Sequence, residues 1–208
     1  MRDPRRPRLD PRPPRPQSVP VQPRPVVASA SLSSHVPTRT RCPVPGIILQ
    51  INTSDGGVPK LPVDRAYLSG EGLFGDRQRN TDVHGGPERA LCLYGIEVIE
   101  RLRGEGHPIA PGTAGENVTL RGIDWTRMLP GARLRLGGQV EVELTRYTAP
   151  CRNISASFHD GRFTRISQKV HPGESRIYAR VLREGWLVAG DAVEMVAPGD
   201  ASAVDDDE

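Results

Sequence analysis

The sequence predicts a mainly β domain that is barrel-like and carries helical additions. Many short stretches rich in Val, Leu and Ile alternate with turns that contain Gly or Pro, which is typical of sheets that close on themselves. Only one stretch, after Pro87, repeats its apolar residues at helical spacing. Aromatic residues make up 4 % of the 208 residues, so the core must be built from aliphatic side chains.

The two ends of the chain differ in composition from the part between them. Residues 1–44 are rich in Pro and Arg, and the first 41 hold nine arginines against two aspartates, a net of +7. We expect this arm to be disordered, because it can bury little apolar surface. Residues 197–208 form an acidic tail with a net charge of −5, so one domain is expected at 45–196. No aromatic residue interleaves the arginines of the arm, which argues against a nucleic-acid partner.

The cysteine content and hydropathy indicate a cytoplasmic protein. Cys42, Cys92 and Cys151 are odd in number and lack the paired spacing of a disulfide framework, so reduced thiols are expected. No apolar run approaches the ~18 residues of a membrane-spanning helix. Pro and Ser interrupt any apolar segment that could follow the charged N-terminus, so we predict neither a membrane span nor a secretory signal.

The domain is expected to begin with two strands. Residues 46–51 are a short apolar run, and a turn-rich loop follows them. A second strand lies within 60–68, where Pro62 places its start at a sheet edge. Lys60 is interpreted as a solvated residue of that edge.

A helix of about three or four turns is predicted after Pro87, which suits a first helical turn. Its spacing is carried by Leu91, Tyr94, Val98, Ile99 and Leu102. Gly104 ends it. Cys92 would then be a structural residue inside an amphipathic helix.

The second half of the domain predicts further short strands and hairpins. Residues 133–136 and 140–147 alternate in polarity and flank a Gly-Gly pair, which is a strong hairpin signal. A second hairpin is expected at 158–166, turning at Asp160 and Gly161. The remaining strands are expected at 118–120, 177–182, 186–188 and 192–196.

The stretch from Leu73 to Tyr94 is the first candidate for ligand binding. Its His84-Gly85-Gly86 triplet precedes the predicted helix, and a glycine loop at a helix N-terminus offers free N–H groups to an anion. The arginines of the stretch, Arg77, Arg79 and Arg89, add positive charge. Loops of this kind also occur without ligands, and His84 could act as a general acid, an anion ligand or a hydrogen bond donor that orders the loop.

Cys151 is the second candidate. It follows a predicted strand, with Pro150 before it and Arg152 after it, and an adjacent cation favours the thiolate. The alternative is a small packing residue. Glu116 and Asn117 lie where a loop meets a strand, a common place for side chains that contact a ligand. The histidines lack zinc-type spacing, and no nucleophile elbow, phosphate loop or dinucleotide motif is present.

Four blocks in this order resemble the MOSC family, named after the C-terminal domain of molybdenum cofactor sulfurase. They are GLFGDRQ with HGGPERALCLY, then PGTAGENVTL, YTAPCRNI and RIYARVLREGWLVAGDAVEMV. The resemblance covers about 45–196 and is closest to the small stand-alone bacterial members related to the 6-N-hydroxylaminopurine resistance protein. It implies a β-barrel-like fold and binding of the molybdenum cofactor. Some members reduce N-hydroxylated substrates, and others are proposed to carry or transfer sulfur.

The resemblance also implies roles for individual residues. Cys151 takes the position of the molybdenum ligand or persulfide carrier, and His84 joins it as a candidate catalytic residue. The loop motif and the GEN block imply cofactor contacts from Asp76, His84, Gly85, Gly86, Glu116 and Asn117. Arginines suit the phosphate of molybdopterin, so the expected cofactor-binding residues also include Arg77 and Arg89 and, beside the cysteine, Thr148 and Arg152.

Two functions remain open at this point. The first is a molybdenum-cofactor-dependent oxidoreductase that reduces N-hydroxylated compounds. A redox partner protein would deliver the electrons, because the chain has no ferredoxin-like Cys cluster. The second is a sulfur or cofactor carrier that uses a Cys151 persulfide and works with a cysteine desulfurase. Pyridoxal phosphate would belong to that partner, because Lys60 and Lys169 have no local context for a Schiff base.

Overall fold

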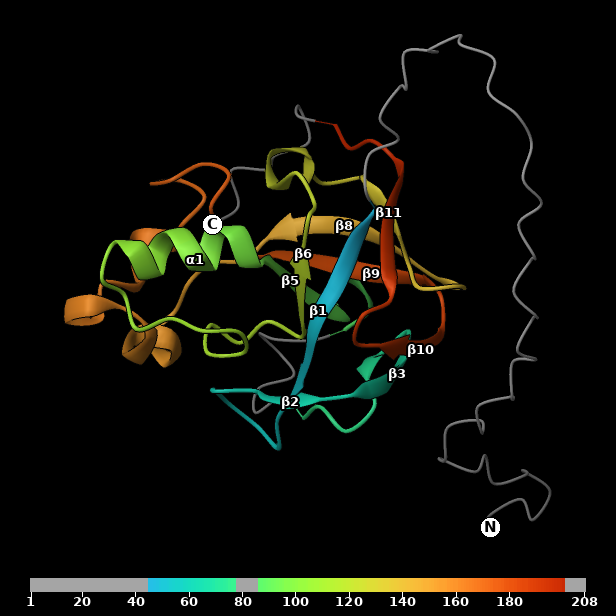
Figure 1. Cartoon of the computed structure of the whole chain (residues 1–208), viewed down its shortest axis with the longest axis horizontal. Helices are drawn as coiled ribbons and strands as arrows, with labels where there is room; N and C mark the ends of the chain where they lie inside the picture. The colour runs from blue at the N-terminus through green and yellow to red at the C-terminus, as the bar shows by residue number, and fades with distance from the viewer. Residues whose placement is uncertain (1–44, 78–85, 201–208) are drawn as a thin grey trace, which may run out of the picture. The chain divides into compact units, whose positions relative to one another are not determined.

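A closed barrel forms the centre of the computed structural model, which describes residues 45–77 and 86–200 (Figure 1). Its strands are β1 (Gly46–Thr53), β5 (Leu91–Gly95), β6 (Val118–Arg121), β7 (Arg133–Leu136), β8 (Val140–Tyr147), β9 (Ile177–Arg183) and β11 (Ala192–Ala197). They are hydrogen-bonded in the order β11-β7-β8-β9-β5-β6-β1, and β1 pairs with β11 to close the ring. The predicted mainly β, barrel-like fold is confirmed.

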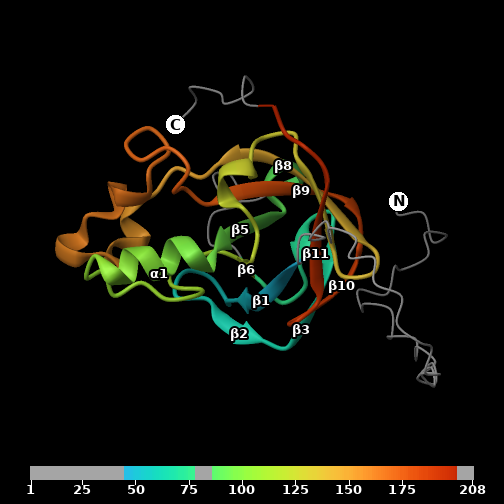
Figure 2. The same cartoon turned by 45° about the horizontal axis from the view of Figure 1, so that its top comes forward.

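Smaller elements extend the barrel (Figure 2). β2 (Leu61–Val63) pairs with β1 outside the ring, and Pro62 lies on this edge strand as predicted. A separate three-stranded sheet has the order β10 (Gly185–Val188), β3 (Arg65–Ser69) and β4 (Gly72–Leu73). In the described part of the chain, no helix is long and apolar enough to cross a membrane. The predicted arm at 1–44, together with 78–85 and 201–208, lies outside the described residues.

The hairpin predicted around the Gly-Gly pair is present as β7 and β8, with the predicted bounds. Along β8, Val142 and Leu144 are buried in the core, whereas Glu141 and Glu143 face outward. Glu143 accepts a hydrogen bond of 2.8 Å from Arg133 Nε on the neighbouring strand. The core inside the barrel is largely aliphatic, as the composition indicated.

The helix begins later than predicted. Pro87–Arg89 forms only a short 3-10 turn (η1), and the helix α1 spans Ile96–Gly104, ending where the sequence predicted. Leu91 and Tyr94 therefore belong to β5, in which all residues are buried. A short run that is buried on all sides has no polar face, and its apolar spacing cannot separate a strand from a helix.

The hairpin predicted at 158–166 is absent. The chain instead forms three short 3-10 turns, η3 (Arg152–Ser157), η4 (His159–Gly161) and η5 (Phe163–Ile166). Asp160 and Gly161 do have positive φ angles of 55° and 67°, as a tight turn requires. The flanking apolar side chains pack into the core rather than pairing as strands, since Phe158 contacts the His107 ring edge-on at 5.4 Å.

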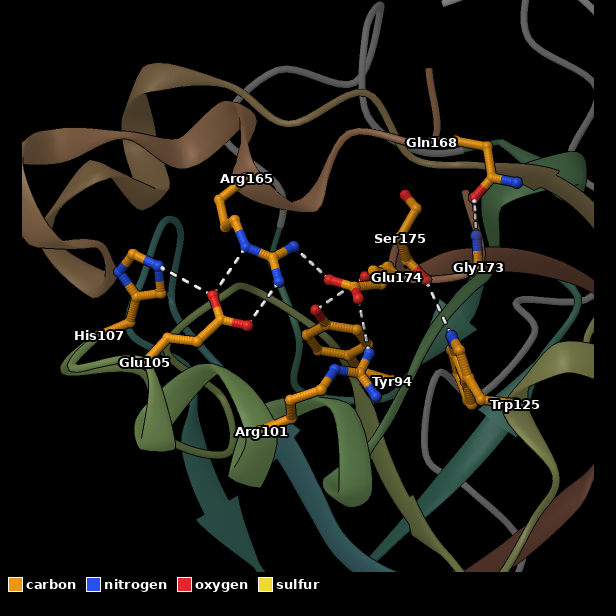
Figure 3. A network of polar contacts seen from close by, with 10 residues as sticks. All are labelled: Tyr94, Arg101, Glu105, His107, Trp125, Arg165, Gln168, Gly173, Glu174 and Ser175. Atoms are coloured by element: carbon orange, nitrogen blue, oxygen red, sulfur yellow. Dashed lines mark hydrogen bonds and ion pairs between the residues drawn. The ribbon is translucent and has the colours of Figure 1, made fainter. Parts of the chain in front are cut away.

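A polar network holds α1 against the segment that contains these turns (Figure 3). Arg165 donates hydrogen bonds to both carboxylate oxygens of Glu105, at 2.8 and 2.6 Å, and also pairs with Glu174. Arg101 at the end of α1 lies 3.0 Å from the same Glu174. Tyr94 adds a hydrogen bond of 2.9 Å from its hydroxyl to the Glu174 carbonyl. Helix, barrel and turns are therefore joined through one arginine–glutamate cluster.

His107 makes this attachment sensitive to pH. Its Nδ1 accepts a 3.0 Å hydrogen bond from the backbone N–H of His159, which requires an unprotonated Nδ1. Burial lowers the pKa of His107 below its ordinary value of 6.5. As the pH falls below about 6.5, the unfolded chain therefore binds a proton before the folded one, and stability decreases. Hydrogen bonds from Arg165 lower the pKa of Glu105 below its ordinary value of 4.5, so protonation of Glu105 decreases stability only below about pH 4.5.

We accordingly expect the free energy of unfolding to fall between about pH 6.5 and about pH 5, and His107→Asn to remove most of this fall. An asparagine Oδ1 can accept the His159 N–H but does not titrate. Urea unfolding of both proteins across this range measures the effect. His171→Asn is the control and should keep the wild-type slope. An unchanged slope in His107→Asn would mean that another group controls it.

Candidate functional site

A cavity of about 310 Å³ is lined by residues from several parts of the barrel. The lining comes from segments that follow β1 and β8 and segments that precede β5, β6 and β9, together with Cys92 on β5 and Tyr178 on β9. This volume is in the range of small-molecule and cofactor sites. Four of the predicted site residues line it, namely Arg77, Arg89, Asn117 and Cys151. Segments far apart in the sequence therefore meet as the motif blocks suggested.

The cavity has a basic lining formed by Lys60, Arg77, Arg89 and Arg176. Lys60 was expected to be solvated at a strand edge, but its side chain is only 10 % exposed and pairs with Asp76. Its backbone N–H also donates to the Gly112 carbonyl at 2.9 Å. Any side chain at position 112 would clash with the backbone of Lys60, because a Cβ there would lie 2.3 Å from the Lys60 carbonyl oxygen.

Arg176 was not predicted as a site residue. It directly precedes β9, is largely buried, and donates from Nη1 to the Ala114 carbonyl. Its Nε is buried and has no hydrogen bond partner among the described residues. Arg176 nevertheless contributes to the cavity lining and adds positive charge there. Arg176 is the first residue of the block RIYARVLREGWLVAGDAVEMV, but no site role was expected of it.

Asp76 organises the cavity from behind its lining. One carboxylate oxygen accepts the Ser54 N–H at 2.8 Å, and the other accepts the Asn117 amide at 2.8 Å and the Lys60 ammonium. Asn117 in turn accepts the Cys92 N–H on its side-chain oxygen at 3.1 Å. The predicted Asp76 and Asn117 are therefore joined in one hydrogen-bonded unit that fixes Lys60.

Two thiols lie in the cavity lining. Cys151 is partly exposed at the turn between β8 and η3, as its position after a strand suggested. Cys92 was expected inside a helix but lies on β5 and is 5 % exposed. Burial raises the pKa of Cys92 to about 11, which keeps this thiol protonated near neutral pH. Because 87–102 was interpreted as a helix, Cys92 was not expected at the site.

Comparison with known proteins identifies the family. Residues 80–194, more than half of the chain, match the sequence profile of the MOSC domain. The chain belongs to the MOSC domain family. The uncharacterized protein YflK of Bacillus subtilis (strain 168) is 30 % identical over 149 residues, which are 69 % of this chain and 65 % of YflK.

Two further similarities concern one protein sequence and one solved structure. A protein named Reductase from Gibberella moniliformis is 25 % identical over 179 residues, or 78 % of this chain and 31 % of that protein. The crystal structure of YiiM from Geobacillus stearothermophilus superposes with a TM-score of 0.56 at 22 % identity, covering 77 % of this chain and 79 % of YiiM. The likeness to YiiM concerns the fold. The chain spans less than two thirds of the length of YflK or of the Gibberella protein.

Other predicted residues of the MOSC motifs lie beside the cavity lining or away from it. Glu116 is fully buried, and its Oε1 accepts the Gly112 N–H at 2.6 Å and the Thr119 hydroxyl at 3.0 Å. Burial raises its pKa, which favours the protonated acid. Thr148 is also buried, and its hydroxyl has no partner among the described residues. Arg152 is exposed to solvent.

The glycine loop of the MOSC motif differs from its prediction. Gly86 has a φ of 81° and precedes η1, which is only three residues long, so no full helix N-terminus points from this loop. Positive charge at the cavity comes instead from the basic lining. His84 and Gly85 lie outside the described residues.

The two thiols predict an unequal response to alkylation. In a Cys42→Ser background, iodoacetamide near neutral pH should modify Cys151, whereas Cys92 should stay unmodified until the protein is unfolded. Cys92 is both buried and held as a neutral thiol, and alkylation requires an accessible thiolate. Peptide mass spectrometry before and after addition of urea measures this order. Equal labelling of both cysteines in the folded protein would contradict the buried position of Cys92.

Proposed function

We propose that this MOSC protein binds a molybdenum cofactor in the cavity and reduces N-hydroxylated compounds, with Cys151 as the molybdenum ligand. The observation that carries the proposal is the joint presence of a thiol and a basic lining in one ligand-sized cavity. Family membership and the relative named Reductase support it. A separate redox protein would deliver the electrons.

The residues of the cavity fit a molybdopterin in their chemistry. The cofactor carries a phosphate, and Lys60, Arg77, Arg89 and Arg176 are the cations that would hold it. Molybdenum accepts a soft thiolate ligand, which Cys151 can supply. Asn117 would orient the ligand while its own amide is fixed by Asp76.

When bound, the cofactor supplies a metal centre that passes two electrons to the substrate. The chain contributes binding, orientation and exclusion of water. Asp76 keeps the Lys60 ammonium in place, which means that the cation needs little reorganisation when an anion arrives. Val58 and Ile154 add apolar surface to the lining, and a lower local dielectric strengthens the attraction between the basic lining and an anion.

Two measurements test the proposal. Protein produced in a host that makes the cofactor should contain molybdenum and pterin, and it should oxidise a reduced viologen dye only when an N-hydroxylated substrate is added. Bound cofactor with a Cys151 persulfide but no turnover would favour the carrier function, with a pyridoxal-phosphate-dependent desulfurase as the sulfur source. Absence of both metal and pterin would contradict the proposal.

A further inference from the structure

Tyr178 lies in the cavity lining but was not among the predicted site residues. It stands on β9 directly opposite Cys92 on β5 in the antiparallel register, so the two side chains are cross-strand neighbours on one face. Cys92 also lines the cavity, so the face that the two side chains share is the one directed toward the cavity. Tyr178 is therefore held by two central barrel strands rather than by a loop, and its ring has a defined position.

The Tyr178 hydroxyl differs from those of the other three tyrosines. The hydroxyls of Tyr67, Tyr94 and Tyr147 donate to Glu184, the Glu174 carbonyl and the Met128 carbonyl, at 3.4, 2.9 and 3.1 Å. Within residues 45–77 and 86–200, no hydrogen bond partner is found for the Tyr178 hydroxyl. Partly buried hydroxyls are normally paired with protein, water or ligand. Tyr178, the tyrosine without such a protein partner, is also the one that lines the cavity.

Tyr178 shares the cavity with both thiols. Cys92 is its cross-strand neighbour, and Cys151 lines the same cavity of about 310 Å³. Burial raises the pKa of Tyr178 to about 12, so the phenol remains a neutral hydrogen bond donor. Tyr178 and the cysteine that would hold the metal therefore line one ligand-sized space.

We propose that Tyr178 is a specificity-determining residue whose hydroxyl donates a hydrogen bond to the N–O oxygen of the substrate. This inference rests on the proposed function. Reduction breaks the N–O bond, takes up two electrons from the redox partner and two protons, and releases the amine and water. The amine product lacks the oxygen that Tyr178 recognises. Loss of this hydrogen bond after turnover would favour exchange of product for substrate.

The test compares substrate and product as ligands in the absence of a reductant, where no turnover occurs. Calorimetric titration of molybdenum-loaded protein with 6-N-hydroxylaminopurine and with adenine gives the ratio of the two dissociation constants. Tyr178→Phe should raise the dissociation constant of 6-N-hydroxylaminopurine by about 3- to 10-fold, as expected for one lost hydrogen bond. The dissociation constant of adenine and the molybdenum content should stay unchanged. Tyr147→Phe removes a hydroxyl outside the cavity lining and should leave the ratio as in the wild type.

Each other outcome overturns a specific statement. Loaded Tyr178→Phe protein that keeps the wild-type ratio overturns the inference and leaves the proposed function intact. Loss of molybdenum or pterin from Tyr178→Phe, with a normal melting temperature, means that the hydroxyl holds the cofactor and also overturns it. A wild-type protein without molybdenum contradicts the proposed function, and the inference fails with it.

Discussion

Cys151→Ser should lower turnover of N-hydroxylated substrates by more than about 100-fold, because it removes a direct metal ligand and not merely its support. A serine hydroxyl stays protonated near neutral pH and is a hard oxygen donor, whereas molybdenum accepts a soft thiolate. The fold should tolerate the change, since Cys151 is partly exposed and serine is nearly the same size. The measurements are viologen oxidation, molybdenum content and melting temperature of the same preparation.

Cys92→Ser is the matched control, because it changes the other thiol of the same cavity. It should keep molybdenum and its thiolate-to-metal absorption, while losing about 1–3 kcal/mol of stability through a buried hydroxyl without a good partner. Full turnover in Cys151→Ser would remove the centre of the proposed function and leave only the family and the fold. Loss of a persulfide with retained pterin would instead indicate the carrier function.

The barrel could be predicted where each strand carries its own signal. β7 and β8 alternate in polarity around a tight glycine turn, so their pairing is local and readable. β5 could not be recognised, because all of its residues are buried and its identity as a strand depends on β6 and β9 on either side. The hairpin expected at 158–166 is absent for a related reason, because its apolar residues pack into the core and against His107 rather than pairing as strands.

The residues of the candidate site divide in the same way, into those with a local sequence signal and those placed by contacts distant in sequence. Cys151, Arg77 and Asn117 lie in or beside motif blocks and were predicted, and all of them line the cavity. Lys60 lies outside the motif blocks and Tyr178 lies inside the fourth one, but both were missed because the contacts that place them at the cavity are not local in sequence. Lys60 is buried by a carboxylate 16 residues away, and the cavity-facing direction of Tyr178 follows from the register between β5 and β9.

Asp76→Ala should lower the free energy of unfolding by about 3–5 kcal/mol, because it leaves the Lys60 ammonium without its partner in a mostly buried position. The two side chains are 4 % and 10 % exposed. The same change also removes the acceptor for the Ser54 N–H and for the Asn117 amide. Urea unfolding measures the loss. Asp55→Ala is the control, because Asp55 is 87 % exposed in its pair with Arg77 and should contribute at most about 1 kcal/mol.

The double variant Asp76→Ala with Lys60→Met separates the cost of an unpaired charge from the loss of packing. A methionine fills most of the lysine volume without a charge, so the double variant should be more stable than Asp76→Ala alone. It should still retain less pterin than the wild type, because one cation of the basic lining is gone. If Asp76→Ala lowers the free energy of unfolding no more than Asp55→Ala does, the buried Lys60–Asp76 pair does not stabilise the fold. If the double variant keeps all its pterin, Lys60 takes no part in binding the cofactor.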